Sequence, residues 1–159
     1  MRIIALNCAK NGKADVVAMR LASNSDVVYV KPYTTKPVPI NNEVWDNDDY
    51  VHLNDKQLAD KMEKEIVAVS CEVGKYKYVY FQNQFSSGFV VLLLDDNCLK
   101  IMKEKYGDDL ISVRVKSNSE QLSERSGNLR DGFYDIVFDY DYEDIDDLEW
   151  RISYDCDKA

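Results

Sequence analysis

The sequence is short of the residues that build metal centres and disulfide frameworks. It contains one histidine and four cysteines, and no two cysteines form a CxxC pair. The histidine, His52, alternates with Val51 and Leu53, which predicts a residue on the surface of a strand rather than a catalytic base. A Cys/His metal site is therefore not expected, and the scattered cysteines are interpreted as reduced thiols.

Long apolar runs and an excess of positive charge are also missing. No apolar stretch approaches the roughly 20 residues that a membrane helix needs. The chain begins directly with a strand pattern and no signal peptide, so we expect a cytoplasmic protein without a membrane partner. The net charge of −9 lacks the basic footprint of nucleic-acid binders, so no nucleic-acid partner is expected. Residues 131–149 are crowded with Asp and Glu and predict a solvated face.

The composition that is present, 159 residues with 45% hydrophobic and 31% charged, is that of one globular domain. Short apolar runs alternate with segments of helical spacing. The predicted strands are 3–6, 26–30, 50–53, 66–73, 76–82, 89–94, 110–115 and 134–138, and the predicted helices are 13–22, 56–64, 97–106, 119–126 and 145–151. This alternation favours an α/β sheet, with ligands bound beyond the carboxyl ends of its strands.

Residues 3–22 have the layout of a phosphate-binding loop: a strand, a short polar turn, Gly12-Lys13 and a helix. In such a loop, backbone N–H groups face a phosphate and the Lys reaches the outer phosphates. Two positions depart from the pattern, because Asn7 stands where it has Gly and Ala14 where it has the Mg²⁺-binding Ser or Thr. Asn7 tolerates a left-handed backbone, whereas Ala14 cannot replace a hydroxyl. Ordinary turn chemistry is the alternative interpretation of Gly12-Lys13.

Further segments, taken with this loop, resemble the guanylate kinase family of P-loop nucleoside monophosphate kinases. They occur in the family's order and are Tyr33–Pro39 with Asp49-Tyr50, Glu72–Tyr76, Val90–Asp95 with Tyr106, and Tyr134–Phe138. The resemblance covers about residues 1–150. It implies a P-loop kinase-like parallel sheet flanked by helices, in a single domain over 1–159. A small antiparallel subdomain at about 32–82 would bind the nucleoside monophosphate.

The resemblance also implies a role for each matching residue. The expected nucleotide-binding residues are Asn11, Gly12, Lys13, Ala14, Thr34, Thr35, Lys36, Tyr50 and Glu72, and the expected catalytic residues are Lys13, Asp95, Arg125 and Arg130. Lys13 would serve the phosphates of ATP, and Asp95 would hold Mg²⁺. Tyr50 would contact the acceptor phosphate and Glu72 the guanine edge. Phosphoryl transfer needs this positioning and neutralisation of charge more than it needs covalent help.

Several departures from the family pattern reduce the expected activity. The family's two phosphate-gripping arginines fall at Lys36 and Val38, and the lid must fit between about 116 and 133, where Arg125 and Arg130 are the only arginines. Losing one transition-state arginine costs about 10³-fold or more. Two residues also have ordinary interpretations, since Asp95 suits a helix cap and Glu72 the outer side of a strand.

Three hypotheses stay open. The first is a guanylate-kinase-like protein that binds a purine nucleotide and has at most weak ATP-dependent phosphoryl transfer to GMP or dGMP. The second is a catalytically inactive domain, a pseudokinase, that acts as a protein-interaction or regulatory module. The third is a phage-type deoxynucleoside monophosphate kinase with altered base choice. Nucleotide-dependent stabilisation discriminates the first from the second, because a ligand that binds only the folded state raises its stability.

Overall fold

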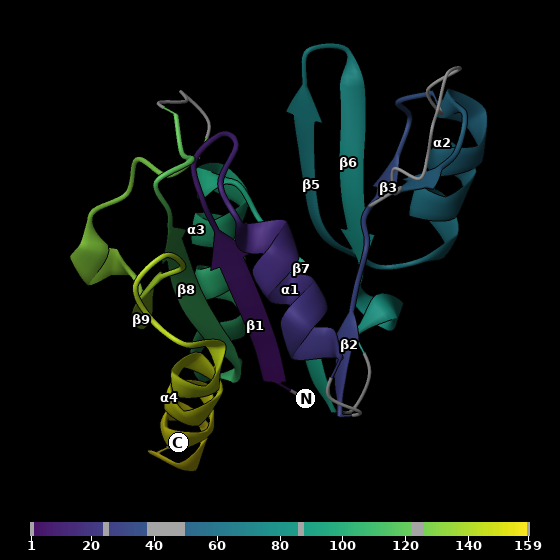
Figure 1. Ribbon diagram of the computed structural model, residues 1–159. Helices are drawn as coiled ribbons and strands as arrows, with labels where there is room; N and C mark the ends of the chain where they lie inside the picture. The colour runs from purple at the N-terminus through teal and green to yellow at the C-terminus, as the bar shows by residue number, and fades with distance from the viewer. Residues whose placement is uncertain (1, 24–25, 38–49, 86–87, 122–125, 159) are drawn as a thin grey trace. The chain divides into compact units, whose positions relative to one another are not determined.

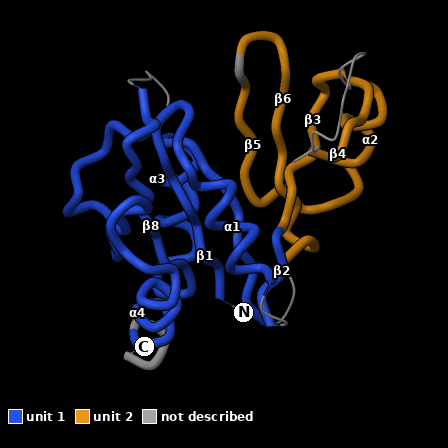
Figure 2. The backbone as a smooth tube through the Cα atoms, viewed as in Figure 1, with its two compact units in different colours: residues 1–29, 86–159 blue, residues 30–85 orange. Residues whose placement is uncertain are grey.

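The computed structural model (Figure 1) describes residues 2–23, 26–37, 50–85, 88–121 and 126–158. Val38, Asp49 and Arg125, to which the sequence assigned parts in the site, lie outside the described residues. The chain divides into two compact units, which Figure 2 shows in different colours. Unit 1 comprises residues 1–29 and 86–159, and unit 2 comprises residues 30–85.

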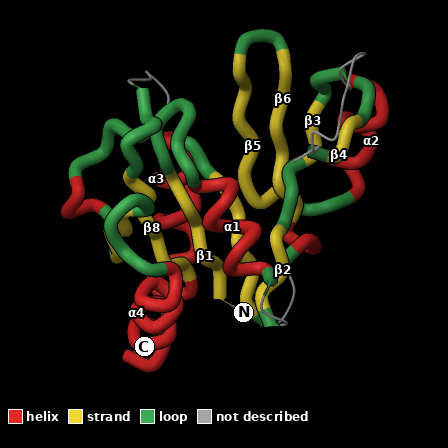
Figure 3. Tube along the Cα trace, in the orientation of Figure 1, coloured by secondary structure: helices red, strands yellow, loops and turns green. Residues whose placement is uncertain are grey.

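Unit 1 is an α/β unit with a five-stranded sheet in the order β2-β7-β1-β8-β9, and every pair of neighbouring strands is parallel. Three of its strands are each followed by an α-helix along the chain (Figure 3). Its elements are β1 (Arg2–Asn7), α1 (Ala14–Ala22), β2 (Val27–Tyr29), β7 (Phe89–Leu93), α3 (Asp96–Tyr106), β8 (Leu110–Lys116), β9 (Ile136–Asp139) and α4 (Ile145–Lys158). The predicted fold class, a parallel sheet flanked by helices, is confirmed.

The unit 1 sheet is covered on both faces, by α1 and α4 on one side and by α3 on the other (Figure 1). Successive strand residues point to opposite faces. Ile4 and Leu6 of β1 therefore share one core cluster with Val17 of α1 and Leu148 of α4. β1 lies between β7 and β8, which explains why its apolar run is continuous rather than alternating.

The parallel register brings the carboxyl ends of the central strands to one edge of the unit 1 sheet. Leu6 lies opposite Leu93 of β7, and Asn7 lies opposite Arg114 of β8. The segments that follow these strands, the loop into α1 and the start of α3, therefore meet at this edge. It is the edge at which open α/β sheets bind their ligands.

Unit 2 is built on a four-stranded sheet in the order β4-β3-β6-β5. Its elements are β3 (Tyr33–Thr34), β4 (Val51–His52), α2 (Asp55–Lys64), β5 (Val67–Val73) and β6 (Tyr76–Phe81). β5 and β6 form the predicted antiparallel pair. Asn54 caps α2 in a capping box with Gln57, and Leu58 packs with Val79 and Phe81 in a small core. The bounds of unit 2 lie close to the predicted subdomain, whose ligand stays a prediction.

Two predicted helices differ from the structure by more than one residue. No helix covers the described part of residues 119–126, because Gln121 instead forms an antiparallel bridge with Lys10. Local capping signals could not reveal this pairing, since its partner is more than a hundred residues away. The last helix, α4, begins at Ile145 as predicted and continues to Lys158.

Candidate functional site

The loop from β1 into α1 forms a tight turn. The N–H of Gly12 donates to the Ala9 carbonyl at 3.0 Å, and Asn11 has a left-handed backbone with φ of 61°. A Cβ on Gly12 would lie 2.8 Å from both the Cβ and the Sγ of Cys8, so only glycine fits there. The left-handed position is thus Asn11, whereas Asn7, which would tolerate such a backbone, is the last residue of β1.

Asn7 is the centre of a buried hydrogen-bond network, with 1% of its surface exposed. Its Nδ2 donates to the Leu94 carbonyl at 2.9 Å and to Asp96 Oδ1 at 3.1 Å. The same nitrogen lies 3.1 Å from Ser126 Oγ. Its Oδ1 accepts the Tyr134 hydroxyl proton at 2.7 Å. A glycine here, as in a full phosphate-binding loop, could make none of these side-chain bonds.

Tyr134 keeps its proton because of this environment. Burial raises the pKa of its hydroxyl, and the nearby Asp96 carboxylate raises the pKa further. Both effects disfavour a phenolate. Tyr134 therefore acts as a hydrogen-bond donor to Asn7 rather than as a base.

The segment 126–128 packs directly on the loop. The carboxylate of Asp96 accepts N–H groups from Gly127 at 2.9 Å and from Asn128 at 3.0 Å. Ser126 Oγ donates to the Cys8 carbonyl at 2.5 Å. Gly127 has φ of 82°, and a Cβ on it would lie 2.7 Å from the Cβ of Ala9. The loop is therefore held from outside by a segment distant in sequence.

A carboxylate binds one N–H group of the β1–α1 loop. Glu120 Oε2 accepts the Ala9 N–H at 2.6 Å and lies 2.8 Å from Arg114 Nη1, while its Oε1 accepts the Ser117 N–H at 3.0 Å. The side chains of Arg114 and Glu120 are 9% and 12% exposed. An N–H group and a guanidinium converging on an anionic oxygen would equally suit a phosphate. Here Glu120 supplies that oxygen.

The start of α1 also directs a backbone donor inwards. The N–H of Ala14 hydrogen-bonds the sulfur of Cys8 and lowers the pKa of that thiol, but burial outweighs this and leaves the pKa raised. The Glu120 carboxylate raises it further. Cys8 is thus a protonated thiol, and the N–H groups of Ala9 and Ala14 both have partners inside the protein.

The other predicted residues of unit 1 take different positions. Lys13 is half-buried at the N-cap of α1, and among the described residues its side chain makes no hydrogen bond or ion pair. Asp95 caps α3 by accepting the Cys98 N–H at 2.9 Å, as its ordinary interpretation expected. Arg130 is exposed. The metal and catalytic roles assigned to these residues stay predictions.

The predicted residues of unit 2 form a separate group around β3. Thr34 is fully buried and its Oγ1 accepts the Lys36 N–H at 3.1 Å, while Thr35 Oγ1 accepts the Lys77 N–H at 2.9 Å. Tyr50 is 39% exposed, and its ring lies 5.4 Å from that of Tyr78, the β6 residue opposite Thr34. Lys36 and Glu72 are exposed. The structure brings Thr34 and Tyr50 to one region of the sheet.

Sequence reasoning missed the residues that make most of the contacts at the unit 1 edge. Arg114 carried a usable signal, since a charged residue inside a buried strand needs a partner. Glu120 carried none, because nothing near it in the sequence marks the loop as its partner. Asp96 was missed because its neighbour Asp95, which directly follows the apolar run, was assigned the metal-binding role instead.

The sheet order, the helices on both faces and the β1–α1 loop define a P-loop kinase-like α/β fold. The crystal structure of guanylate kinase from Anaplasma phagocytophilum is a solved example of this arrangement. It is 15% identical to this chain with a TM-score of 0.65, and the match covers 96% of this chain and 82% of that one. At this identity the likeness shows the guanylate-kinase-like fold alone, which agrees with the resemblance found in the sequence.

No protein-family model matches the sequence, and no curated protein matches it either. Among the described helices, none combines the length and the apolar character needed to cross a membrane.

Proposed function

We propose that this chain is a catalytically inactive guanylate-kinase-like domain that works by binding a protein partner. The observation that carries the proposal is the Glu120 carboxylate at the β1–α1 loop. It accepts the Ala9 N–H and pairs with Arg114, the groups that would otherwise be offered to a phosphate. The loop keeps its fold while one of its donors, the Ala9 N–H, binds an internal anion.

A nucleotide phosphate entering this loop would meet a negative charge. Two like charges about 4 Å apart repel by roughly 1 kcal/mol in water and roughly 4 kcal/mol at the effective dielectric near a protein surface. Displacing Glu120 instead would break its bonds to Arg114 and to the Ser117 N–H. Either route weakens phosphate binding, which supports an inactive domain.

The residues that would hold Mg²⁺ and ATP fit these groups poorly. Ala14 offers no hydroxyl, and Asp95 accepts an N–H as the cap of α3. The oxygens of Asp96 accept the N–H groups of Gly127 and Asn128. Mg²⁺ is usually held by one or two carboxylates together with substrate phosphates. A site that lacks the hydroxyl and whose carboxylates have N–H partners supports the same conclusion.

The second candidate is a purine-nucleotide-binding protein with weak ATP-dependent transfer to GMP or dGMP. One observation favours it: Gly12-Lys13 stands at the start of α1, and the Lys13 side chain has no ion-pair or hydrogen-bond partner among the described residues. Lys13 would then serve the ATP phosphates and Asp95 would hold Mg²⁺. Tyr50, Thr34 and Glu72 would contact the acceptor. A phage-type kinase with another base preference is a variant of this candidate.

Thermal unfolding and a coupled kinase assay of the full chain test the proposal. The ligands are Mg²⁺-ATP, GMP, dGMP and the other deoxynucleoside monophosphates, and the proteins are wild type, Lys13→Ala and Lys10→Ala as the matched control. We expect no turnover and no change in melting temperature. A ligand at 100 times its Kd would stabilise the fold by about 2.7 kcal/mol, so binding would be visible. Turnover, or an ATP shift that Lys13→Ala abolishes and Lys10→Ala keeps, would contradict it.

A further inference from the structure

We propose that the exposed face of α4 binds a basic, arginine- or lysine-rich segment of a partner protein. This α4 face consists of Asp146, Asp147, Trp150 and Tyr154. The inference rests on the proposed function, because it names the surface and the partner chemistry through which an inactive domain would act.

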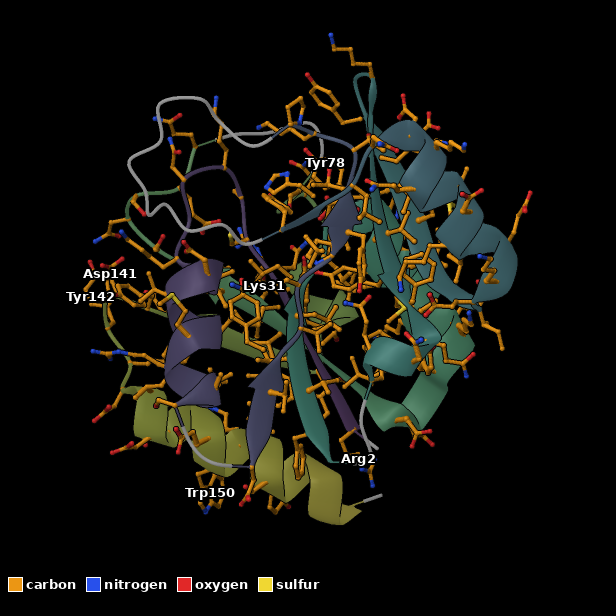
Figure 4. The ribbon with its side chains drawn as sticks, turned by 90° about the vertical axis from the view of Figure 1, so that its right-hand side faces the viewer. Arg2, Lys31, Tyr78, Asp141, Tyr142 and Trp150 are labelled. Atoms are coloured by element: carbon orange, nitrogen blue, oxygen red, sulfur yellow. The ribbon has the colours of Figure 1, made fainter. Side chains whose placement is uncertain are left out.

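The α4 face displays two large aromatic side chains. Trp150 is 66% exposed and Tyr154 is 48% exposed, and their rings stack with centroids 5.4 Å apart and planes 13° from parallel. Figure 4 shows Trp150 projecting outwards from the helix. The other side of α4 is the core side, where Leu148 and Ile152 are buried. Trp and Tyr are the residues most enriched at interface hot spots, so this stack is a strong candidate contact.

Negative charge surrounds the stack. Asp146 lies one helical turn before Trp150 on the same face, and Asp147 lies three residues before it. Both are exposed. The cation nearest in sequence, Arg151, lies one helical turn after Asp147, but its guanidinium is bonded to Glu143 and to the Val137 carbonyl. Both of these bonds are therefore to groups other than the two aspartates of the α4 face.

A pocket opens at the start of the same helix, about 270 Å³ in volume. Its lining includes the carboxylates of Asp141 and Glu143, the guanidinium of Arg20, and Ile145, the first residue of α4. Ile145 precedes Trp150 by five residues, which places it about 7.5 Å away along the helix axis and about 140° around it. Ile145 packs on the core side of α4, so the pocket neighbours the α4 face without being part of it, and the aromatic stack and the two aspartates alone form the proposed contact.

The negative charge of the α4 face determines which kind of partner can bind it. A second copy of the chain would bring the same acidic face and the same net charge of −9, so self-association through this face is repelled. Nucleic acids and anionic lipids are repelled for the same reason. A guanidinium or ammonium is attracted both by the aspartates and by the faces of the aromatic rings. A basic protein segment is the partner that can interact with both the aspartates and the aromatic rings of the α4 face.

A fluorescence titration with defined peptides tests the inference on the full chain. Trp45→Phe leaves Trp150 as the only tryptophan, so its emission reports on the α4 face. The probe is a twelve-residue peptide of alternating Arg and Ser, and the control peptide has Gln in place of each Arg. We expect the Arg peptide to change the Trp150 emission saturably, and less so at high salt. The Gln peptide should leave it unchanged.

Calorimetry on matched variants then locates the peptide-binding site. These variants are made in the wild-type sequence, without Trp45→Phe. We expect Trp150→Ala with Tyr154→Ala to weaken Arg-peptide binding about tenfold or more. Asp146→Asn with Asp147→Asn should weaken it less and reduce its salt dependence. Ile101→Ala on α3 is the control, since Ile101 is also an exposed apolar residue, at 49%. It should bind as wild type does.

Two results would overturn the inference. One is Arg-peptide binding that the aromatic double variant leaves unchanged. The other is a wild-type dimer in sedimentation that Trp150→Ala converts to a monomer, because the occupant would then be a second copy. If the protein turns over nucleotide and also binds the peptide through α4, the proposal of an inactive domain is refuted and the α4 binding surface is supported. If the protein shows neither turnover nor peptide binding, only the α4 binding surface is refuted.

Discussion

The carboxyl edge of the unit 1 sheet and the sheet of unit 2 each carry residues assigned to the predicted site, and their polar groups differ in environment. At the unit 1 edge, Asn7 is 1% exposed and Glu120 is paired with Arg114. In unit 2, Glu72 is exposed and Tyr50 keeps 39% of its surface exposed. Unit 1 uses its polar groups to hold its own loop, whereas unit 2 buries Thr34 but leaves Tyr50 and Glu72 exposed.

On the proposed function, this contrast explains how a kinase-like fold is kept without kinase chemistry. The strand order depends on apolar packing, which tolerates a change of polar groups at the sheet edge. The polar groups there can then stabilise the loop in place of a ligand. Variants that remove these contacts should therefore cost stability in unit 1, while equivalent changes at exposed positions should cost little.

The largest effect is expected from Glu120→Ala. Removing one partner of a largely buried ion pair leaves Arg114 without its carboxylate, and we expect a loss of about 3 kcal/mol in the free energy of unfolding. Millimolar phosphate should restore part of it, because an anion can pair with Arg114 and the Ala9 N–H. Urea unfolding with and without phosphate, at matched ionic strength, measures both. Glu63→Ala at an exposed position of α2 is the control. A loss below about 1 kcal/mol in the free energy of unfolding would show that the Glu120–Arg114 pair contributes no more than an exposed ion pair.

Asn7→Ala should be nearly as costly. It leaves the Tyr134 hydroxyl and the Leu94 carbonyl without their partner, and buried unsatisfied groups cost about 1–3 kcal/mol each. Allowing for relaxation, we expect about 2–3 kcal/mol in urea unfolding. Asn97→Ala, at an exposed position of α3, should change stability by less than about 0.5 kcal/mol. Similar losses in both variants would show that the Asn7 network does not hold the loop.

A pair of glycine variants separates backbone strain from loop contact. Gly127 and Gly74 both have positive φ, so alanine is strained at each and should cost about 1 kcal/mol. A Cβ on Gly127 would also meet Ala9, whereas a Cβ on Gly74 meets nothing within 4 Å. We therefore expect Gly127→Ala to cost about 1 kcal/mol more than Gly74→Ala in thermal unfolding. Equal costs would mean that segment 126–128 does not press on the loop.

The smallest effect is a pH dependence at the unit 1 edge. The folded-state pKa of Tyr134 is raised above its unfolded value of about 10. Its contribution to stability is therefore complete below about pH 10 and is lost as the pH rises further. Tyr134→Phe should remove this alkaline decline, at a cost near neutral pH of about 1 kcal/mol for the lost bond to Asn7. Urea unfolding between pH 8 and about 11 checks it, and an unchanged alkaline slope would refute the assignment.

The fold was accessible from the sequence because its signals are local. The runs at Ile3–Leu6 and 89–94 are apolar on both faces, and each precedes a segment of helical spacing. The antiparallel pair around Gly74 was marked by its turn. These patterns, taken in order, also produced the resemblance to guanylate kinases, with which the solved structure agrees in fold.

The contacts at the site were not accessible in the same way. Glu120 contacts Ala9 across 111 residues, and Tyr134 contacts Asn7 across 127. No spacing rule connects such positions. The same limit explains the predicted helix at 119–126, where hydrogen bonds to Lys10 and Asn11 prevail over local helix signals. The roles assigned to Lys13, Asp95, Tyr50 and the other site residues stay predictions.

The amide resonance of Ala9, followed by NMR while Mg²⁺-ATP is added, tests the central claim most directly. In wild type, we expect no saturable shift, because Glu120 already accepts this N–H. Glu120→Ala should show a shift with phosphate, which confirms that the resonance reports an anion. A saturable Ala9 shift in wild type that disappears in Lys13→Ala would contradict the account, since the loop would then bind a nucleotide phosphate with Glu120 in place.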